Sequence, residues 1–269
     1  MDKKLVIIPT YNEKENIADI ISAVFALPGE FHVLVIDDGS PDGTADIVKG
    51  LMAGVHTPES SASPTPPING PLPLTRPRVA MDSGACTPST RLHLIERSGK
   101  LGLGTAYLTG FKWALEHGYD YVFEMDADFS HDPKDLLRLH KACTEGADLA
   151  VGSRYCNGVS VVDWPMGRIV MSYFASTYVR GILRMHIYDT TAGFVCYSRK
   201  VLETMNLDKV KMKGYGFQIE MKYTAYKLGF KIKEVPIIFT NRQKGTSKMS
   251  GGIFGEAFWG VIGLRFRRF

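Results

Sequence analysis

Short apolar runs alternate with helical segments along this chain, and each apolar run ends in a polar turn. The first run is residues 5–8 and the second is residues 33–36, and a helical pattern follows each of them. Both runs are continuously apolar, which is typical of strands that are covered on both faces. This order of strand, turn and helix predicts an α/β fold whose sheet is mostly parallel, with helices on both faces.

The polar turns that close these runs are the expected location of a site. Residues 9–13, 37–44 and 126–130 each follow an apolar run. Ligands of parallel α/β sheets bind at the carboxyl ends of the strands, so we expect the three turns to meet there. In the first turn, Asn12 with Glu15 three residues later predicts the start of a helix.

Asp126 and Asp128 are the candidate metal ligands of the chain. They follow the apolar run 121–124, the small Ala127 lies between them, and Asp132 and Pro133 open the next helix. Two carboxylates at a strand exit can hold a hard divalent cation that is shared with a phosphate. Aspartates at this spacing also cap helices in ordinary polar loops, so the motif alone supports both interpretations.

Basic residues follow at three later points of the chain. Arg154 comes after the strand 149–151, where an arginine beside several aspartates indicates an anion. Arg168 and Ser172 share one face of a helix, which is either an interfacial helix that binds a phosphate or a core helix with a solvated arginine. Residues 242–248 form a basic loop that is either a cation clamp for a diphosphate or a solvated segment.

Two further motifs support more than one interpretation. The glycine-rich turn 102–107 opens a helix and can either cradle a phosphate or allow tight backbone packing. Gln218 and Glu220 enter a later helix, either as contacts to a sugar or as ordinary polar residues of a helix start.

Composition indicates one large domain with an insertion. The chain has 269 residues and is 45% hydrophobic, which is enough for a sizeable core. Residues 56–90 contain eight of its 14 prolines and are expected to be a disordered surface insertion. The four scattered cysteines do not have the spacing of a zinc site or a disulfide scaffold.

Charge and hydropathy limit the partners that we expect. A net charge of +4 is too small to indicate a nucleic-acid partner. No apolar run reaches the roughly 20 residues of a membrane span, and we expect no secretory signal peptide. The apolar, arginine-ended C-terminal segment is expected to lie at a membrane surface.

Taken together, the motifs resemble those of the dolichyl-phosphate mannosyltransferases, which are inverting glycosyltransferases of the GT-A fold. The resemblance covers nearly everything outside residues 56–90. It rests on the strings PTYNE, DDGSPDGT, GLGTAY, MDADFSHDP, GSRY, GYGFQIEM and RQKGTSK. It implies a Rossmann-like GT-A catalytic domain over residues 1–248 with short interface helices, and an interfacial tail over residues 249–269.

The resemblance also implies a role for each matching position. The GDP pocket would be lined by Pro9, Tyr11, Glu13, Ile36 and Asp38. The metal and the diphosphate would be held by Asp126, Ala127, Asp128 and Ser130. The donor or the transferring groups would be contacted by Arg154, Arg242 and Lys248, and the lipid phosphate by Arg168 and Ser172. Members of the family often carry arginine where this chain has Val195, which bears on one contact on the acceptor side.

The implied reaction is transfer of mannose from GDP-mannose to dolichyl phosphate, with Mg²⁺ or Mn²⁺ as cofactor. Its product would supply protein glycosylation and GPI-anchor synthesis at the cytosolic face of the endoplasmic reticulum membrane. The enzyme would attach through the helix around residues 168–179, through its tail, or through small membrane-embedded partner subunits. Two alternatives are a related transferase that uses UDP-glucose or a different polyprenyl phosphate, and a catalytically silent subunit that binds a nucleotide sugar.

Overall fold

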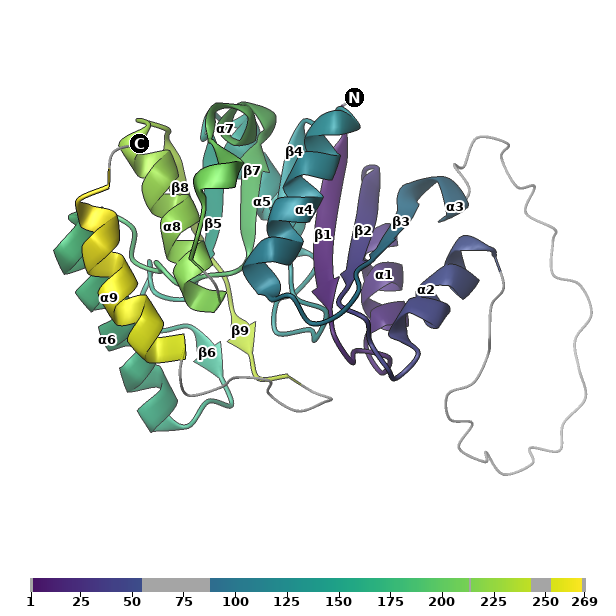
Figure 1. Cartoon of the computed structure of the whole chain (residues 1–269), viewed down its shortest axis with the longest axis horizontal. Helices are drawn as coiled ribbons and strands as arrows, with labels where there is room; N and C mark the ends of the chain where they lie inside the picture. Colours follow the sequence, from purple (N-terminus) through teal and green to yellow (C-terminus); the bar gives the residue numbers. More distant parts are fainter. Residues whose placement is uncertain (1, 55–87, 213, 243–252, 268–269) are drawn as a thin grey trace, which may run out of the picture.

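The computed structural model describes residues 2–54, 88–212, 214–242 and 253–267 (Figure 1). The strands of the main sheet are β1 Lys4–Thr10, β2 Phe31–Asp37, β3 Leu92–Glu96, β4 Tyr121–Glu124, β5 Leu149–Ser153, β7 Val195–Ser198 and β8 Ile232–Pro236. A small separate pair consists of β6 Val161–Val162 and β9 Phe239–Thr240. The helices are α1 Ile17–Phe25, α2 Thr44–Met52, α3 Pro88–Arg91, α4 Leu103–Glu116, α5 Asp135–Thr144, α6 Met166–Leu183, α7 Arg199–Thr204, α8 Gly214–Lys227 and α9 Ile253–Arg265, with a 3₁₀ turn at Leu207–Lys209.

The main sheet has the strand order β3-β2-β1-β4-β7-β5-β8. β7 runs antiparallel to β4 and β5, and every other neighbouring pair is parallel. This arrangement confirms the predicted mostly parallel α/β sheet. β1, β2 and β4 therefore end at the same edge, where their polar turns meet.

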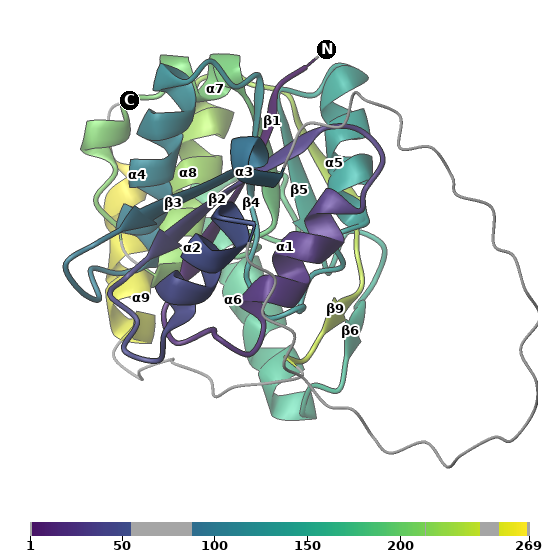
Figure 2. The ribbon, with the colours of Figure 1, turned by 90° about the vertical axis from the view of Figure 1, so that its right-hand side faces the viewer.

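Helices cover both faces of the sheet, α1 and α5 on one side and α4 and α8 on the other (Figure 2). Val6 and Ile8 point into the first apolar cluster, whereas Leu5 and Ile7 point into the second. Each face of β1 is therefore buried, which explains why its sequence is continuously apolar. Gly110 brings α4 close to the sheet, since a Cβ there would lie 2.7 Å from Ile7 Cδ1.

A third apolar cluster joins α6, α8 and α9 at one end of the sheet (Figure 1). Val179 of α6, Tyr223 of α8, and Val261 and Leu264 of α9 are all buried in it. The segment predicted as an interfacial tail is thus partly built into the domain, while its proposed contact with a membrane stays a prediction. Among the described helices, none is long and apolar enough to cross a bilayer.

The first helix starts later than predicted. Asn12 does not cap it, because its φ of 57° places it in a turn and the helix begins at Ile17. The loop after β2 holds this turn: the Asn12 N–H donates to Ser40 Oγ at 2.9 Å and the Lys14 N–H to Asp42 Oδ2 at 3.1 Å. These contacts between neighbouring loops replace the helical turn that the local pattern predicted.

One other boundary differs from the sequence prediction. Most of the predicted insertion, residues 56–87, lies outside the described residues, but residues 88–90 belong to α3. Arg91 completes that helix, so the third strand begins at Leu92. Later in the chain, residues 232–240 form two strands, β8 and β9, and β8 ends at Pro236, which has no N–H to continue a strand ladder.

Candidate active site

Asp38 lies where β2 ends, and its carboxylate organises the neighbouring glycine-rich turn. Its Oδ1 accepts a hydrogen bond from Arg97 Nε at 2.6 Å, and its Oδ2 accepts the N–H groups of Leu101 and Gly102 at 3.1 and 3.2 Å. Gly104 packs tightly, because a Cβ there would lie 3.0 Å from the ring of Phe217. The packing interpretation of this turn is thus confirmed, and the predicted contact of Asp38 with GDP stays a prediction.

The other residues predicted to line the GDP pocket divide into two groups. Pro9, Tyr11 and Glu13 are half-buried at the end of β1 and beyond it, and Lys100 Nζ lies 4.9 Å from the centre of the Tyr11 ring. Ile36 is different, because it is fully buried in the cluster between the sheet and α4. Its side chain belongs to the core because both faces of β2 are covered by helices, and the prediction that Ile36 lines the GDP pocket stays a prediction.

The carboxylates predicted to bind metal form a crowded pair. Asp126 is half-buried, and Ala127 and Asp128 are buried. Burial, together with the nearby charge of Asp128, raises the pKa of Asp126 to about 7, while Arg242 opposes the shift. A carboxylate in such surroundings is stabilised by an added positive charge.

Asp128 is held from both sides. Its Oδ1 accepts the Ser130 N–H at 3.0 Å, and its Oδ2 lies 2.8 Å from Arg242 Nη2. The carbonyl oxygen of Ser130 accepts a hydrogen bond from the Thr240 N–H at 3.1 Å. This bond joins β9 to residues 126–130, which we call the carboxylate loop. The structure therefore brings together two segments that the sequence predicted separately, the aspartate motif and the start of the basic loop. Lys248 and residues 243–252 lie outside the described residues.

The aspartate pair fits a divalent cation that shares its ligands with a substrate. Within the part of the chain that the structure describes, no group of three or more His, Cys, Asp or Glu side chains could hold a metal alone. Mg²⁺ prefers oxygen ligands and commonly takes one or two carboxylates, with phosphates and waters completing its shell. The raised pKa of Asp126 agrees with such a site, and a metal-ligand role for Ser130 stays a prediction.

Arg154 forms a buried pair that the sequence did not reveal. Its Nε and Nη2 donate to the two oxygens of Asp189 at 2.7 and 2.6 Å, and its backbone N–H donates to Oδ2 at 3.0 Å. Burial alone would raise the pKa of Asp189, but Arg154 holds it below its usual value. Asp189 therefore balances the charge of Arg154 and fixes the position of its guanidinium. The predicted contact of Arg154 with the donor stays a prediction.

Arg168 and Ser172 lie together on α6, as the helical spacing predicted. The guanidinium of Arg168 lies 3.9 Å from the centre of the Trp164 ring, and its Nη1 donates to Asn241 Oδ1 at 3.3 Å. Among the described residues, no carboxylate pairs with this arginine. Ser172 Oγ accepts a hydrogen bond from Tyr155 OH at 2.7 Å. Asn241, Tyr155 and Trp164 were not predicted, and their only sequence signal is that each adjoins a predicted motif.

Three other positions lie in the interior. Glu220 is fully buried, accepts the N–H groups of Lys211 and Met212 at 3.0 and 2.7 Å, and pairs with Arg267. It anchors these segments, so its interpretation as a sugar contact is wrong. Gln218 is also buried. Val195, where relatives often carry arginine, is fully buried on β7 opposite Glu124, so this position faces the core.

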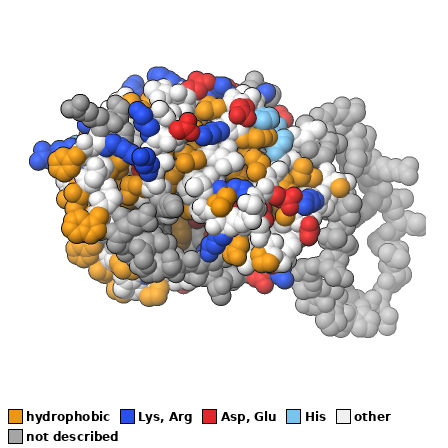
Figure 3. All heavy atoms as spheres, in the orientation of Figure 1, with side chains coloured by type: hydrophobic (Ala, Val, Ile, Leu, Met, Phe, Trp, Pro, Cys, Tyr) orange, Lys and Arg blue, Asp and Glu red, His pale blue; other side chains and the backbone are white. Residues whose placement is uncertain are grey.

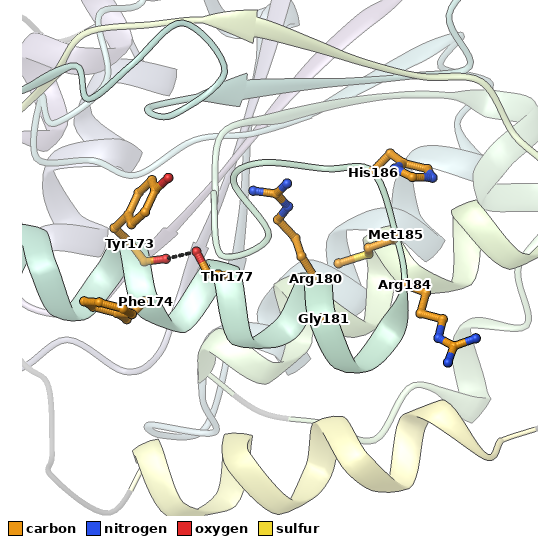
Figure 4. A pocket seen from close by; sticks show the side chains of 8 residues that line it. All are labelled: Tyr173, Phe174, Thr177, Arg180, Gly181, Arg184, Met185 and His186. Carbon is orange, nitrogen blue, oxygen red and sulfur yellow. Dashed lines mark hydrogen bonds between the residues drawn. The ribbon is translucent and has the colours of Figure 1, made fainter.

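A cavity of about 500 Å³ lies along α6 and the turn that follows it (Figure 4). It is lined by Tyr173, Phe174, Thr177, Arg180, Gly181, Arg184, Met185 and His186. None of these is a predicted site residue, and none is acidic. Large apolar side chains are exposed nearby on α6 and on α9, and Figure 3 shows hydrophobic side chains gathered at this end of the molecule.

Relatives with known names match this chain over most of its length. It is 44% identical over 266 residues to polyprenol monophosphomannose synthase of Mycolicibacterium smegmatis, covering 97% of this chain and 88% of the relative. It is 40% identical over 272 residues to undecaprenyl-phosphate mannosyltransferase of Micrococcus luteus, covering 98% of both.

Solved structures show the same fold. Glucosyl-3-phosphoglycerate synthase from Mycobacterium tuberculosis with Mn²⁺, uridine diphosphate and phosphoglyceric acid has a TM-score of 0.65 at 15% identity, covering 98% of this chain and 79% of that chain. The same protein with Mg²⁺ and uridine diphosphate has a TM-score of 0.63 at 15% identity, with the same coverage. The family model "Glycosyl transferase family 2" matches residues 5–59 and 83–205. The chain belongs to glycosyl transferase family 2 and has its GT-A fold.

Proposed function

We propose that this glycosyltransferase transfers mannose from GDP-mannose to a polyprenyl phosphate and inverts the anomeric centre. The observation that carries the proposal is a link through two consecutive residues. Asn241 contacts Arg168 on α6, and Arg242 contacts Asp128 in the carboxylate loop. A site for a lipid phosphate and a site for a sugar diphosphate would therefore share one short segment.

The two relatives support this choice of reaction. Their names specify a polyprenol phosphomannose product and an undecaprenyl-phosphate acceptor, and both match nearly the whole chain at 40% identity or more. Dolichyl phosphate belongs to the same chemical class as these lipids, and we propose it as an acceptor together with undecaprenyl phosphate. GDP as the nucleotide, the endoplasmic reticulum membrane and small partner subunits come from the resemblance of the motifs and stay predictions.

The proposed chemistry needs two anions to be held in line rather than a general base. A phosphate monoester has a second pKa of about 6, so the acceptor oxygen is already largely ionised at pH 7. Arg168 would bind the acceptor phosphate, and Arg242 would lie between it and the departing diphosphate, reducing their repulsion. A Mg²⁺ or Mn²⁺ ion held by Asp126 and Asp128 would neutralise charge on the leaving nucleoside diphosphate. Attack from the side opposite the leaving group inverts the sugar carbon.

The apolar end of the molecule supports contact with the membrane that contains such a lipid. Phe174 on α6 and Trp259 on α9 are 65% and 71% exposed. Arg180 and Arg184 lie at the C-terminal end of α6, where they can contact anionic headgroups. We propose that this surface meets the bilayer, with the N-terminal half of α6 carrying Arg168 and Ser172 to the acceptor phosphate.

The test is a transfer assay with purified protein. GDP-mannose and UDP-glucose are each offered with dolichyl phosphate or undecaprenyl phosphate, in Mg²⁺, in Mn²⁺ or in a chelator. We expect metal-dependent formation of lipid-linked mannose, and its loss in Asp128→Asn. Transfer of glucose instead would favour the related transferase, and no turnover under any condition would favour the silent nucleotide-sugar-binding subunit.

A further inference from the structure

Two charged residues are buried beneath the candidate site, and none of the proposed chemistry uses them. Glu124 is the last residue of β4, just before the carboxylate loop, and Lys222 lies in the middle of α8. Both side chains are fully shielded from solvent. A buried charge is costly unless specific partners compensate it, so the contacts of Lys222 indicate what it stabilises.

The contacts of Lys222 lead to a loop rather than directly to a carboxylate. Its Nζ donates to the Ala192 carbonyl oxygen at 2.5 Å, and to the carbonyl oxygen and Oε1 of Gln218 at 3.2 and 3.4 Å. Within the described part of the chain, no ion pair is formed by this ammonium group. The Gln218 contacts lie within one turn of α8, so the bond to Ala192 is the one that joins α8 to another segment.

The loop that Lys222 holds is the loop that positions Arg154. It begins at Asp189, which accepts three hydrogen bonds from Arg154, and it continues through Thr191, whose Oγ1 accepts another from Arg154 Nη2 at 2.9 Å. Ala192 follows directly and is itself buried. A displacement of Ala192 would therefore move Asp189 and Thr191, the residues that orient the guanidinium of Arg154.

Glu124 interacts with Lys222 through its charge. Its Oε1 accepts a hydrogen bond from Tyr197 OH at 3.4 Å. Burial raises the pKa of Glu124 to about 8, and Lys222 is the largest influence that opposes this shift. Burial likewise lowers the pKa of Lys222 to about 8, against the attraction of Glu124 and Asp189. Each residue thus favours the ionised form of the other, and Lys222 makes a second, separate contact at the loop.

We propose that Lys222 is a positioning residue: its hydrogen bond to Ala192 holds residues 189–192 against α8 and thereby orients Arg154 in the site. The competing explanation is that Lys222 only compensates the buried charge of Glu124. Measuring this effect on turnover rests on the proposed mannosyl transfer, so the test also includes a measurement that does not depend on activity.

Three variants separate the two explanations: Lys222→Met, Glu124→Gln and the double variant. Lys222→Met leaves Glu124 without its compensating charge and is expected to lower the melting temperature. The double variant removes both charges and is expected to recover the melting temperature, but it still has no donor to Ala192. We therefore expect its kcat to stay at least tenfold below that of the wild type, with the affinity for GDP unchanged. Glu124→Gln keeps the bond to Ala192 and is the matched control, with kcat close to wild type.

Hydrogen exchange of the backbone amides gives the readout that is independent of activity. We expect residues 190–193 to exchange faster in Lys222→Met and in the double variant than in Glu124→Gln or the wild type. Recovery of both kcat and amide protection in the double variant would show that Lys222 only balances Glu124 and would overturn the proposal. If the wild type has no transferase activity with any substrate, the proposed function fails, and the exchange measurement still decides the role of Lys222.

Discussion

Arg242 Nη2 lies 2.8 Å from Asp128 Oδ2, which places a guanidinium beside the carboxylate that is proposed to bind metal. The same arginine counteracts the rise in the pKa of Asp126. Arg242 and a divalent cation at the proposed site would therefore compete for the same negative charge as long as no diphosphate is bound. With a sugar diphosphate present, both positive charges would have a partner and would act together.

Arg242→Ala is expected to change metal affinity and turnover in opposite directions. Without donor, the metal should bind more tightly, because its competitor at Asp128 is gone. With donor, kcat should fall by about a hundredfold, which is typical for the loss of one positioned donor to a transition state. A metal titration and an initial-rate assay measure the two effects. Arg138→Ala is the control, because Arg138 pairs with Asp135 on the surface of α5. Unchanged metal affinity in Arg242→Ala would contradict the competition.

Arg168→Ala should selectively weaken binding of the acceptor lipid. Hydrogen bonds to charged groups contribute about 1.5–3 kcal/mol, so we expect KM for a short-chain polyprenyl phosphate in detergent to rise by roughly tenfold to a hundredfold. The affinity for the nucleotide sugar should be unchanged. Arg199→Ala is the control away from α6, since Arg199 pairs with Glu203 on α7 at 2.6 Å. An equal effect of both variants on KM would argue against a phosphate site at Arg168.

The exposed aromatic residues should determine membrane binding. Burial of a large apolar side chain contributes about 1.5–3 kcal/mol, so Phe174→Ser combined with Trp259→Ser should reduce binding to anionic vesicles by at least about tenfold. Flotation with vesicles measures this, with Leu228→Ser as the control at the end of α8. Removal of all of α9 is a poorer test, because Val261 and Leu264 are buried in the domain. Unchanged flotation of the double variant would show that other residues bind the bilayer, whereas a wild type that does not float would point to partner subunits.

His131 should make the protein less stable in mild acid. Its ring is buried against Phe194 and Phe239, and burial lowers its pKa from 6.5 to about 4. Between these values the unfolded chain binds a proton that the folded chain does not, so this contribution to stability is present above pH 6.5 and is lost as the pH falls. The full loss is about 3 kcal/mol.

Urea denaturation at pH 7.5 and pH 5, in the presence of a chelator, measures this contribution. His131→Leu removes the titrating group while keeping an apolar side chain between the rings, so its free energy of unfolding should depend less on pH than that of the wild type. Equal pH dependence in the two proteins would show that the pKa of His131 does not differ between the folded and the unfolded chain.

Local patterns in the sequence were sufficient to predict the architecture and the region in which the candidate site lies. Continuous apolar runs predicted buried parallel strands, and the polar turns after them predicted which edge of the sheet carries Asp38, Asp126 and Asp128. These predictions hold because strand burial and the direction of a parallel strand depend on residues close together in the chain. The spacing of Arg168 and Ser172 likewise placed both on one side of α6.

The partners of the charged residues were decided only by the tertiary structure. Asp38 pairs with Arg97, Arg154 with Asp189, and Asp128 with Arg242, and each pair joins segments that lie far apart in the chain. The local sequence does not show which arginine pairs with Asp189. The pairing depends on which loops the packed sheet and helices bring within hydrogen-bond distance. The same holds for the burial of Lys222: nothing in the sequence around it distinguishes it from a surface lysine, and only the packing of α8 against the sheet encloses it in the core.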